Sequence, residues 1–234
     1  MLFLCTGMIR SGSTWMFNVC RLLLEECGDL DRTVPGYLGE GDDADRVLEQ
    51  LDLKARNVLL KLHNPGPYAE RLIRERRTKD VYTHRDPRDV VVSAHRMWNW
   101  SIDRAIHSMA TTVSVFERRR QSENTLFVAY DDILLRPQAL VPEIAEYLGI
   151  HVDEQMVESI SAATSLDAAR TVATNPAIPF NAAFEFHYDP VTLLHKNHVR
   201  DGTSGYWRQH LTDEQAARVV EVAAPLFDRL GYQR

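Results

Sequence analysis

A glycine-rich loop close to the N-terminus holds the first residues that could do chemistry. Gly7, four further residues, Gly12, Ser13 and Thr14 follow the spacing of a phosphate-binding P-loop, in which a lysine comes after the second glycine. That lysine reaches the β- and γ-phosphates of ATP or GTP, and here Ser13 replaces it. Arg10 is a cation within the same loop. We therefore expect a phosphate site for a ligand that does not need the lysine, the alternative being a plain glycine turn that starts a helix.

Lys61 and His63 lie in the stretch LKLHNP, at the end of an expected strand. Because side chains two residues apart on a strand point to the same side, the two would face one site. An imidazole with an unperturbed pKa of about 6.5 can exchange a proton near physiological pH, and an ammonium group can offset negative charge. The alternative for His63 is a histidine that caps the strand end.

Arg85 and Ser93 stand eight residues apart in HRDPRDVVVSAHR. Asp86 and the proline after it favour a helix start between them, so that the arginine and the serine two turns along can converge. A planar guanidinium and a hydroxyl both donate hydrogen bonds to phosphate. The alternative for Arg85 is a surface salt bridge. We expect Arg88 and Asp89 to form a local ion pair that frames the turn.

These residues sit among apolar stretches that alternate with helical patterns. Expected strands cover residues 2–6, 57–62, 80–84 and 125–129. Expected helices cover residues 14–27, 67–77, 103–122, 138–148, 153–163 and 165–173, and others start near residues 86 and 212. We expect residues 174–205 to be irregular.

Strands that alternate with helices predict parallel pairing through crossover connections. The expected fold class is therefore α/β: a three-layer α/β/α sandwich with a central parallel sheet and a P-loop-like nucleotide site, in a single domain over residues 1–234. In such sheets ligands bind beyond the carboxyl ends of the strands, which is where the three chemically active stretches fall.

Composition excludes some classes of protein. With 44% hydrophobic and 26% charged residues, the chain has an ordinary globular composition. The formal net charge of −6 argues against a nucleic-acid or anionic-membrane partner, so any anion site must be a local cluster. No stretch approaches about 18 uninterrupted apolar residues, so we expect no membrane span. The three cysteines have no paired framework, which favours a reducing, cytoplasmic location. The composition leaves the oligomeric state open.

Six short motifs together resemble those of the sulfotransferases that use 3′-phosphoadenosine 5′-phosphosulfate (PAPS). They are, in order, RSGSTW, KLH, HRDPRDVVVS, AYDD, TSL and RDGTSGYW, and they run from the start of the chain to about residue 212. Each motif alone is weak, whereas their order and internal spacing carry the resemblance. It implies a donor with a sulfated 5′-phosphate, a 3′-phosphate and no γ-phosphate. Such a donor needs neither the P-loop lysine nor a metal ion, and it leaves adenosine 3′,5′-bisphosphate (PAP) as product.

The resemblance also implies which residues bind the donor. Those that cradle the 5′-phosphosulfate or stack on adenine are Arg10, Ser11, Gly12, Ser13, Thr14 and Trp15. Those for the 3′-phosphate are Arg85, Ser93, Arg200 and Gly202, and those near adenine are Tyr130 and Thr164. For Tyr130 and Thr164 a core or capping role is an equal alternative. Asp201 stands where the family has a lysine, so we expect Asp201→Lys to tighten donor binding at low salt.

Sulfuryl transfer in line needs a base for the acceptor's proton and cations for the charge that develops on the leaving group. The resemblance assigns His63 as the base, and Lys61 and Arg10 as the charge-stabilising catalytic residues. We expect residues 30–46 and 174–199 to be lids over a small-molecule acceptor that is hydroxylated and partly apolar, an ordinary packed loop being the alternative for the second range. His187, His195, Trp98 and Trp100 are candidates for its pocket, and the alternative for the two tryptophans is the core.

Two alternatives from other functional classes stay open at this point. One is a nucleotide kinase of related fold, which the missing lysine and the lack of an obvious magnesium-holding aspartate on a strand disfavour. The other is a non-catalytic module that binds PAP. The pair Lys61 and His63 argues weakly against it, because a relic pair would look the same.

Overall fold

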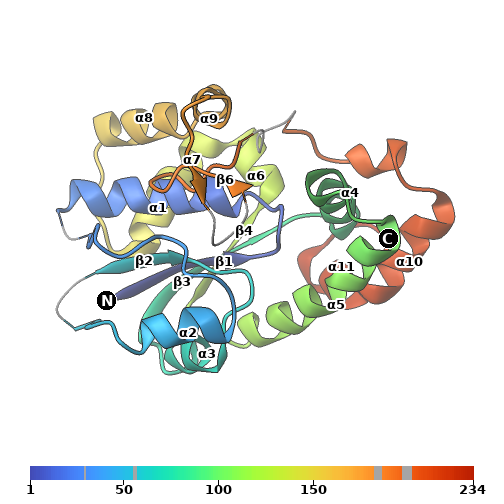
Figure 1. Cartoon of the computed structure of the whole chain (residues 1–234), viewed down its shortest axis with the longest axis horizontal. Helices are drawn as coiled ribbons and strands as arrows, with labels where there is room; N and C mark the ends of the chain where they lie inside the picture. Colours follow the sequence, from blue (N-terminus) through green and yellow to red (C-terminus); the bar gives the residue numbers. More distant parts are fainter. Residues whose placement is uncertain (29, 55–56, 182–185, 197–201) are drawn as a thin grey trace.

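The fold centres on a four-stranded parallel sheet (Figure 1), in a computed structural model that describes residues 1–28, 30–54, 57–181, 186–196 and 202–234. The strand order is β2-β1-β3-β4, and every pairing between neighbours is parallel. The strands are β1 (Leu2–Gly7), β2 (Val58–Lys61), β3 (Thr78–His84) and β4 (Thr125–Ala129). Each lies within a residue or two of the range that the apolar patterning predicts.

Helices cover both faces of the sheet, which confirms the three-layer α/β/α prediction. One face carries α1 (Ser13–Glu26), α7 (Pro137–Leu148) and α8 (Glu154–Ala163). The other face carries α2 (Asp42–Leu48), α3 (Pro67–Arg74), α4 (Pro87–Trp98), α5 (Ile102–Arg119), α10 (Asp213–Val222) and α11 (Ala224–Leu230). Among the described residues, none of these helices has the length and apolarity that crossing a bilayer requires.

Smaller elements complete the chain around the carboxyl ends of the strands. They are α6 (Tyr130–Leu135), α9 (Leu166–Ala173), the two-stranded pair β5 (Phe180–Asn181) and β6 (Phe186–His187), and the 3₁₀ helix η1 (Tyr206–Gln209). The region predicted as irregular, residues 174–205, therefore contains a short antiparallel pair and ends at Gly205, the N-cap of η1. The rest of its described part is irregular, as predicted.

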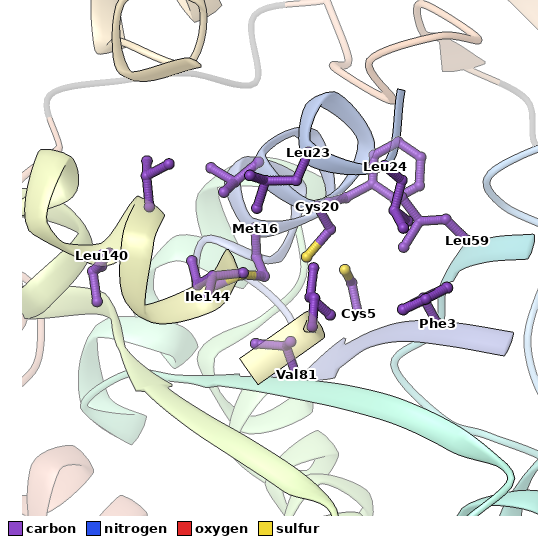
Figure 2. Packing of buried hydrophobic residues seen from close by; sticks show 14 of the residues in the cluster. Phe3, Cys5, Met16, Cys20, Leu23, Leu24, Leu59, Val81, Leu140 and Ile144 are labelled. Atoms are coloured by element: carbon purple, nitrogen blue, oxygen red, sulfur yellow. The ribbon is translucent and has the colours of Figure 1, made fainter. Parts of the chain in front are cut away.

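Alternation along β1 builds two separate cores. Phe3 and Cys5 face α1 and α7, where Figure 2 shows them packed with Met16, Cys20 and Ile144. Leu2 and Leu4 point to the opposite face, where they pack against α2 and α3. A third cluster joins β3 to α4, α5, α10 and α11. Because successive side chains of a strand alternate between faces, the four consecutive apolar residues that begin β1 must be buried on both sides of the sheet.

Helix α2 overlaps residues 30–46, which we expected to be a lid and for which we predicted no helix. Its helical start has a clear physical cause, because acidic residues occupy its first turn, where they favour the positive end of the helix dipole. The Asp45 carboxylate also accepts hydrogen bonds from the backbone N–H groups of Tyr68 and Ala69, at 2.7 and 3.1 Å, and so ties α2 to the start of α3. The sequence prediction did not anticipate this tertiary anchor.

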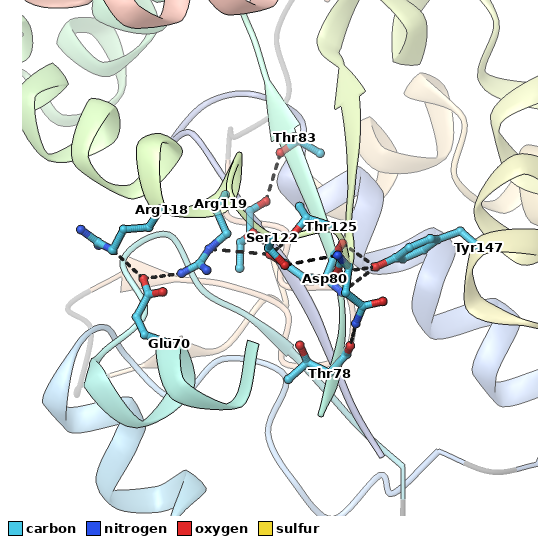
Figure 3. Close-up of polar contacts among 11 residues, drawn as sticks. Glu70, Thr78, Asp80, Thr83, Arg118, Arg119, Ser122, Thr125 and Tyr147 are labelled. Atoms are coloured by element: carbon cyan, nitrogen blue, oxygen red, sulfur yellow. Dashed lines mark hydrogen bonds and ion pairs between the residues drawn. The ribbon is translucent and has the colours of Figure 1, made fainter. Parts of the chain in front are cut away.

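Asp80, within β3, is the centre of a buried polar network (Figure 3). Its carboxylate accepts a hydrogen bond from Thr6 Oγ1 at 2.7 Å and lies 3.7 Å from the Arg119 guanidinium. Arg119 is 1% exposed and also pairs with Glu70. Burial raises the pKa of Asp80 to about 6, although the Arg119 charge opposes this shift. The network therefore holds a buried carboxyl group whose charge depends on one arginine.

Replacing Arg119 with methionine should lower the free energy of unfolding by about 3 kcal/mol at about pH 8, because an ionised Asp80 then lacks its counter-charge. This deficit should shrink as the pH falls through about 6, because a protonated Asp80 no longer needs a counter-charge. The folded-state pKa of Asp80 is raised, so Asp80 favours the folded protein while it is protonated at low pH and loses this contribution as the pH rises.

Urea unfolding at about pH 8 and about pH 5 measures this difference. The control is Arg118→Met, which removes a partly exposed partner of the same Glu70 and should cost about 1 kcal/mol or less at either pH. An Arg119→Met deficit that is equal at both pH values would contradict the account.

Candidate active site

A cavity of about 760 Å³ opens at the carboxyl ends of β1 and β3. In the sheet, β2 lies on one side of β1, and β3, the next strand along the chain, lies on the other side. The strand order therefore reverses between β1 and β3. The predicted site residues on its wall are Arg10, Gly12, Ser13, Thr14, Trp15, Lys61, His63, Arg85, Ser93, Tyr130, Thr164 and Gly202. The fold therefore brings together residues that lie almost two hundred positions apart in the sequence.

The P-loop turns sharply between β1 and α1. Gly7 has a φ of 129°, and a Cβ there would lie 2.4 Å from the Thr83 carbonyl oxygen, so only glycine lets the end of β1 approach β3 this closely. Gly12, with a φ of 89°, is the N-cap of α1. The first backbone N–H groups of a helix have no intrahelical acceptor, and they carry the positive end of its dipole. The start of α1 on the cavity wall is therefore suited to an anion.

Ser11 has a different place from its neighbours in the loop. Its hydroxyl lies 2.6 Å from the Met8 carbonyl oxygen and 2.7 Å from Thr83 Oγ1, and the side chain is fully buried. Ser11 is not among the residues that line the cavity. Its side chain therefore fixes the loop on β3, and any contact of Ser11 with a ligand would come from its backbone N–H.

Arg85 directly follows β3 and lines the cavity. Its guanidinium carbon lies 4.1 Å from the centre of the Tyr130 ring. Its Nη2 donates to the Thr203 carbonyl oxygen at 2.7 Å. Its Nε is buried and has no hydrogen-bond partner among the described residues. Nearby, Arg10 Nε donates to Ser93 Oγ at 2.9 Å. A strand end, the P-loop and α4 thus deliver three phosphate-type donors to one wall.

The predicted ion pair between Arg88 and Asp89 is wrong. Arg88 pairs instead with Asp86, at 2.7 Å between Nη2 and Oδ2, because Asp86 is the N-cap of α4 and its carboxylate already accepts from the Arg88 N–H. Asp89 accepts from the backbone N–H groups of Gly205 and Trp207, at 2.7 and 2.9 Å. Asp89 therefore anchors η1 beside the cavity.

Lys61, the last residue of β2, and His63, two residues beyond it, both line the cavity. Burial lowers the pKa of Lys61 to about 8, with the Glu40 carboxylate opposing this shift and Arg10 adding to it. Burial and the Lys61 charge lower the pKa of His63 to about 3. His63 Nδ1 lies 3.0 Å from the Gly7 carbonyl oxygen. A neutral ring that donates from Nδ1 to this carbonyl keeps a free lone pair on Nε2.

Thr164 has a capping role and also lines the cavity, and its contact with a ligand stays a prediction. It is the C-cap of α8, where its hydroxyl donates to the Ile160 carbonyl oxygen at 2.8 Å. Tyr130 is the first residue of α6 and contributes its ring to the wall. Gly202 reaches the wall with a φ of 61°. Arg200 and Asp201 lie outside the described residues, so their roles stay predictions.

Comparison with known proteins decides the family. A sequence model described as the sulfotransferase domain matches residues 2–231. This chain belongs to the sulfotransferase family. Sulfotransferase 1A1 of Rattus norvegicus is 25% identical over 237 residues, which cover 89% of this chain and 78% of the relative.

Two solved structures share the fold of this sulfotransferase. Mouse sulfotransferase SULT7A1 complexed with PAP aligns with a TM-score of 0.69 at 16% sequence identity, over 97% of this chain and 84% of that one. Retinol dehydratase in complex with androsterone and inactive cofactor PAP aligns with a TM-score of 0.66 at 16% identity, over 100% of this chain and 82% of that one. The predictions of an α/β fold and of the sulfotransferase family are thus confirmed.

Aromatic and apolar side chains also line the sulfotransferase cavity. They include Tyr37, Met97, Trp98, Tyr188 and Leu193. His195 lies on this wall, and burial together with the charges of Lys61 and Arg10 lowers its pKa to about 3. His187 and Trp100 do not line it, since His187 Nδ1 contacts the Ile178 carbonyl oxygen and Trp100 stacks on Trp98.

The sequence analysis missed Glu40, which no motif marks. Its carboxylate accepts hydrogen bonds from the backbone N–H groups of His63 and Asn64, at 2.9 and 2.7 Å. It reaches them from a loop that lies more than twenty residues away along the chain. Only tertiary structure could reveal this contact, because glutamate in a glycine-containing loop has no distinctive pattern.

The imidazole of His63 should stay neutral down to about pH 4, with its proton on Nδ1, because burial and Lys61 lower its pKa. Nitrogen-15 NMR of histidine-labelled protein reads both the pKa and the tautomer. Lys61→Met should raise the pKa of His63 by about one unit, because a nearby like charge is removed. Lys54→Met, at an exposed position, is the control and should leave it unchanged. Titration of His63 near 6.5 in the wild type would contradict the structure.

Proposed function

We propose that this sulfotransferase moves the sulfuryl group of PAPS to a hydroxyl or amine of a small, partly apolar acceptor by in-line displacement. One observation carries the proposal: the start of α1 and the pair Arg85 and Ser93 line one cavity. Two groups of anion-binding donors, with the rings of Trp15 and Tyr130 on the same wall, suit a donor that has phosphates at both ends of an adenosine. The catalytic pair Lys61 and His63 lies on the same wall.

The residues present fit such a donor. The α1 N-terminus offers backbone N–H groups for the 5′-phosphosulfate, and Arg85 has a buried Nε without a partner among the described residues. Ser93 adds a hydroxyl, and Trp15 offers a ring for adenine. The similar structures in complex with PAP support this assignment.

His63, Lys61 and Arg10 then divide the work of transfer. The donor supplies the sulfuryl group and a phosphate leaving group. His63 Nε2 takes the acceptor's proton, while the Gly7 carbonyl holds the ring by Nδ1. Lys61 and Arg10 offset the negative charge of the leaving phosphate. Arg10 acts only electrostatically, because a guanidinium keeps its proton at any ordinary pH.

The acceptor site is proposed on the aromatic wall around Tyr37, Trp98 and Tyr188. Its mixture of apolar surface with His63 and His195 favours an acceptor with an apolar body and one hydroxyl or amine. The retinol dehydratase structures with androsterone and with retinol support small-molecule acceptors of this kind. A cytoplasmic location stays a prediction.

The kinase alternative finds little support. Ser13 stands at the lysine position of the P-loop. Asp80, the aspartate within β3, is bound to Thr6 and Arg119 in the buried network rather than placed at the strand's carboxyl end, where a magnesium ion would need it.

The protein should bind PAP far more tightly than ATP or AMP, and chelation of divalent metals should not change this affinity. The reason is that Arg85 and Ser93 add contacts to a 3′-phosphate that ATP and AMP lack. Calorimetry with each nucleotide, with and without EDTA, measures the difference. Tight ATP binding that disappears with EDTA would favour the kinase.

His63→Ala should reduce turnover by about 10²–10⁴-fold, the usual cost of losing a general base. The dissociation constant of PAP should change little, because other groups hold the phosphates. The assay follows sulfate transfer from radiolabelled PAPS to a mixed panel of phenols, alcohols and amines. His107→Ala, at an exposed position on α5, is the matched control. Wild-type rates in a folded His63→Ala protein would exclude His63 as the base.

A further inference from the structure

The segment of residues 36–41 runs alongside the end of β2 and is hydrogen-bonded to it at both ends. The Lys61 N–H donates to the Gly36 carbonyl oxygen at 2.8 Å, and the Gly41 N–H donates to the Asn64 carbonyl oxygen at 2.8 Å. The segment is therefore bound to the same short stretch that carries Lys61 and His63. Any group on it has a fixed position relative to these two side chains.

Glu40 provides the contacts between these two ends. Its carboxylate accepts from the backbone N–H groups of His63 and Asn64, and the Tyr37 hydroxyl donates to it at 3.2 Å. The Glu40 side chain is not part of the cavity wall, whereas Tyr37, Lys61 and His63 are. Glu40 can therefore act on the reaction only through its neighbours.

The Glu40 carboxylate also interacts electrostatically with the Lys61 ammonium group. The groups that act on Lys61 are Glu40 from this segment, Arg10 from the P-loop and the buried Cys5 thiol of β1. His63 and His195 also interact with Lys61. Of these groups, Arg10 repels the ammonium and the histidines are neutral at working pH. Glu40 is therefore the acidic side chain among them that opposes the loss of the Lys61 proton.

We propose that Glu40 is a positioning residue of sulfuryl transfer: its carboxylate fixes the backbone at His63 and serves as the counter-charge that keeps Lys61 an ammonium ion. This inference rests on the proposed role of Lys61 as a charge stabiliser. It also explains why a half-buried acid lies beside a site for anions. The acid is turned away from the cavity and supports the cation that faces it.

The first test measures the charge of Lys61 directly and needs neither donor nor turnover. The chain has four lysines, so the Lys61 signal in carbon-13 NMR of labelled lysine side chains can be assigned with Lys61→Arg. In Glu40→Gln the pKa of Lys61 should fall by about one unit from its wild-type value of about 8. Glu49→Gln, an exposed acid at the end of α2, is the matched control and should leave it unchanged.

The second test follows kcat/KM for sulfate transfer as a function of pH. Wild-type kcat/KM should decline above about pH 8, as free enzyme loses the Lys61 proton. In Glu40→Gln this decline should begin about one pH unit lower, while the rate near pH 6.5 approaches that of the wild type. A Lys61→Arg background should abolish the displacement, because arginine keeps its proton.

The outcomes separate this inference from the proposed function. A Lys61 pKa that is the same in wild type, Glu40→Gln and Glu40→Asp overturns the counter-charge role, even in an active sulfotransferase. A loss of rate that is equal at every pH, with a lower melting temperature, also overturns it and leaves a purely structural contact. If the protein neither binds PAP nor transfers sulfate, the proposed function fails, and the NMR titration alone still decides the charge of Lys61. Glu40→Asp keeps the negative charge but places it farther from Lys61. The pKa of Lys61 in this variant should therefore lie between its values in wild type and in Glu40→Gln.

Discussion

The active site depends on one close contact, between the carboxyl ends of β1 and β3. Gly7 lies against Thr83 at a distance that no side chain would permit, and the Met8 N–H donates to the Thr83 carbonyl oxygen at 2.9 Å. Ser11 fastens the next turn to the same threonine. The carbonyl of Gly7 in turn holds His63. Because the P-loop is fixed on β3 and His63 is fixed on the P-loop, the phosphate-binding and proton-accepting groups share one rigid frame.

The active-site cavity has an excess of positively charged side chains, and these side chains are partly buried. Arg10, Lys61 and Arg85 all face the cavity, and burial of like charges costs free energy unless opposite charge is near. The protein offsets part of this cost with two carboxylates: Glu40, which acts on Lys61 from outside the cavity wall, and Asp89, which lies on the wall 3.8 Å from the Arg85 guanidinium. The remaining positive charge favours a ligand with several negative groups. A donor with two phosphates and a sulfuryl group meets that requirement.

The fold, and the convergence of the predicted site residues on one cavity, were predictable because their causes are local. Apolar stretches located every strand of the central sheet, and proline, aspartate and glycine located most helix ends. Errors occurred where partners are distant in sequence. Asp89 does not pair with Arg88, because its carboxylate accepts hydrogen bonds from the backbone of Gly205 and Trp207, more than a hundred residues further along. Likewise no helix was predicted where α2 forms, and there Asp45 anchors it to the start of α3.

By itself the sequence determined the α/β architecture, the P-loop without its lysine, and the pair Lys61 and His63, because each depends on residue type and short spacing. Tertiary structure decided which groups act together. It buried the Ser11 hydroxyl within the protein, away from the cavity, and it brought the Glu40 carboxylate close enough to Lys61 to act on its charge. It also set the pKa of His63 to about 3. The physical reason is that burial and Coulomb interactions depend on distance in space, which short motifs do not encode.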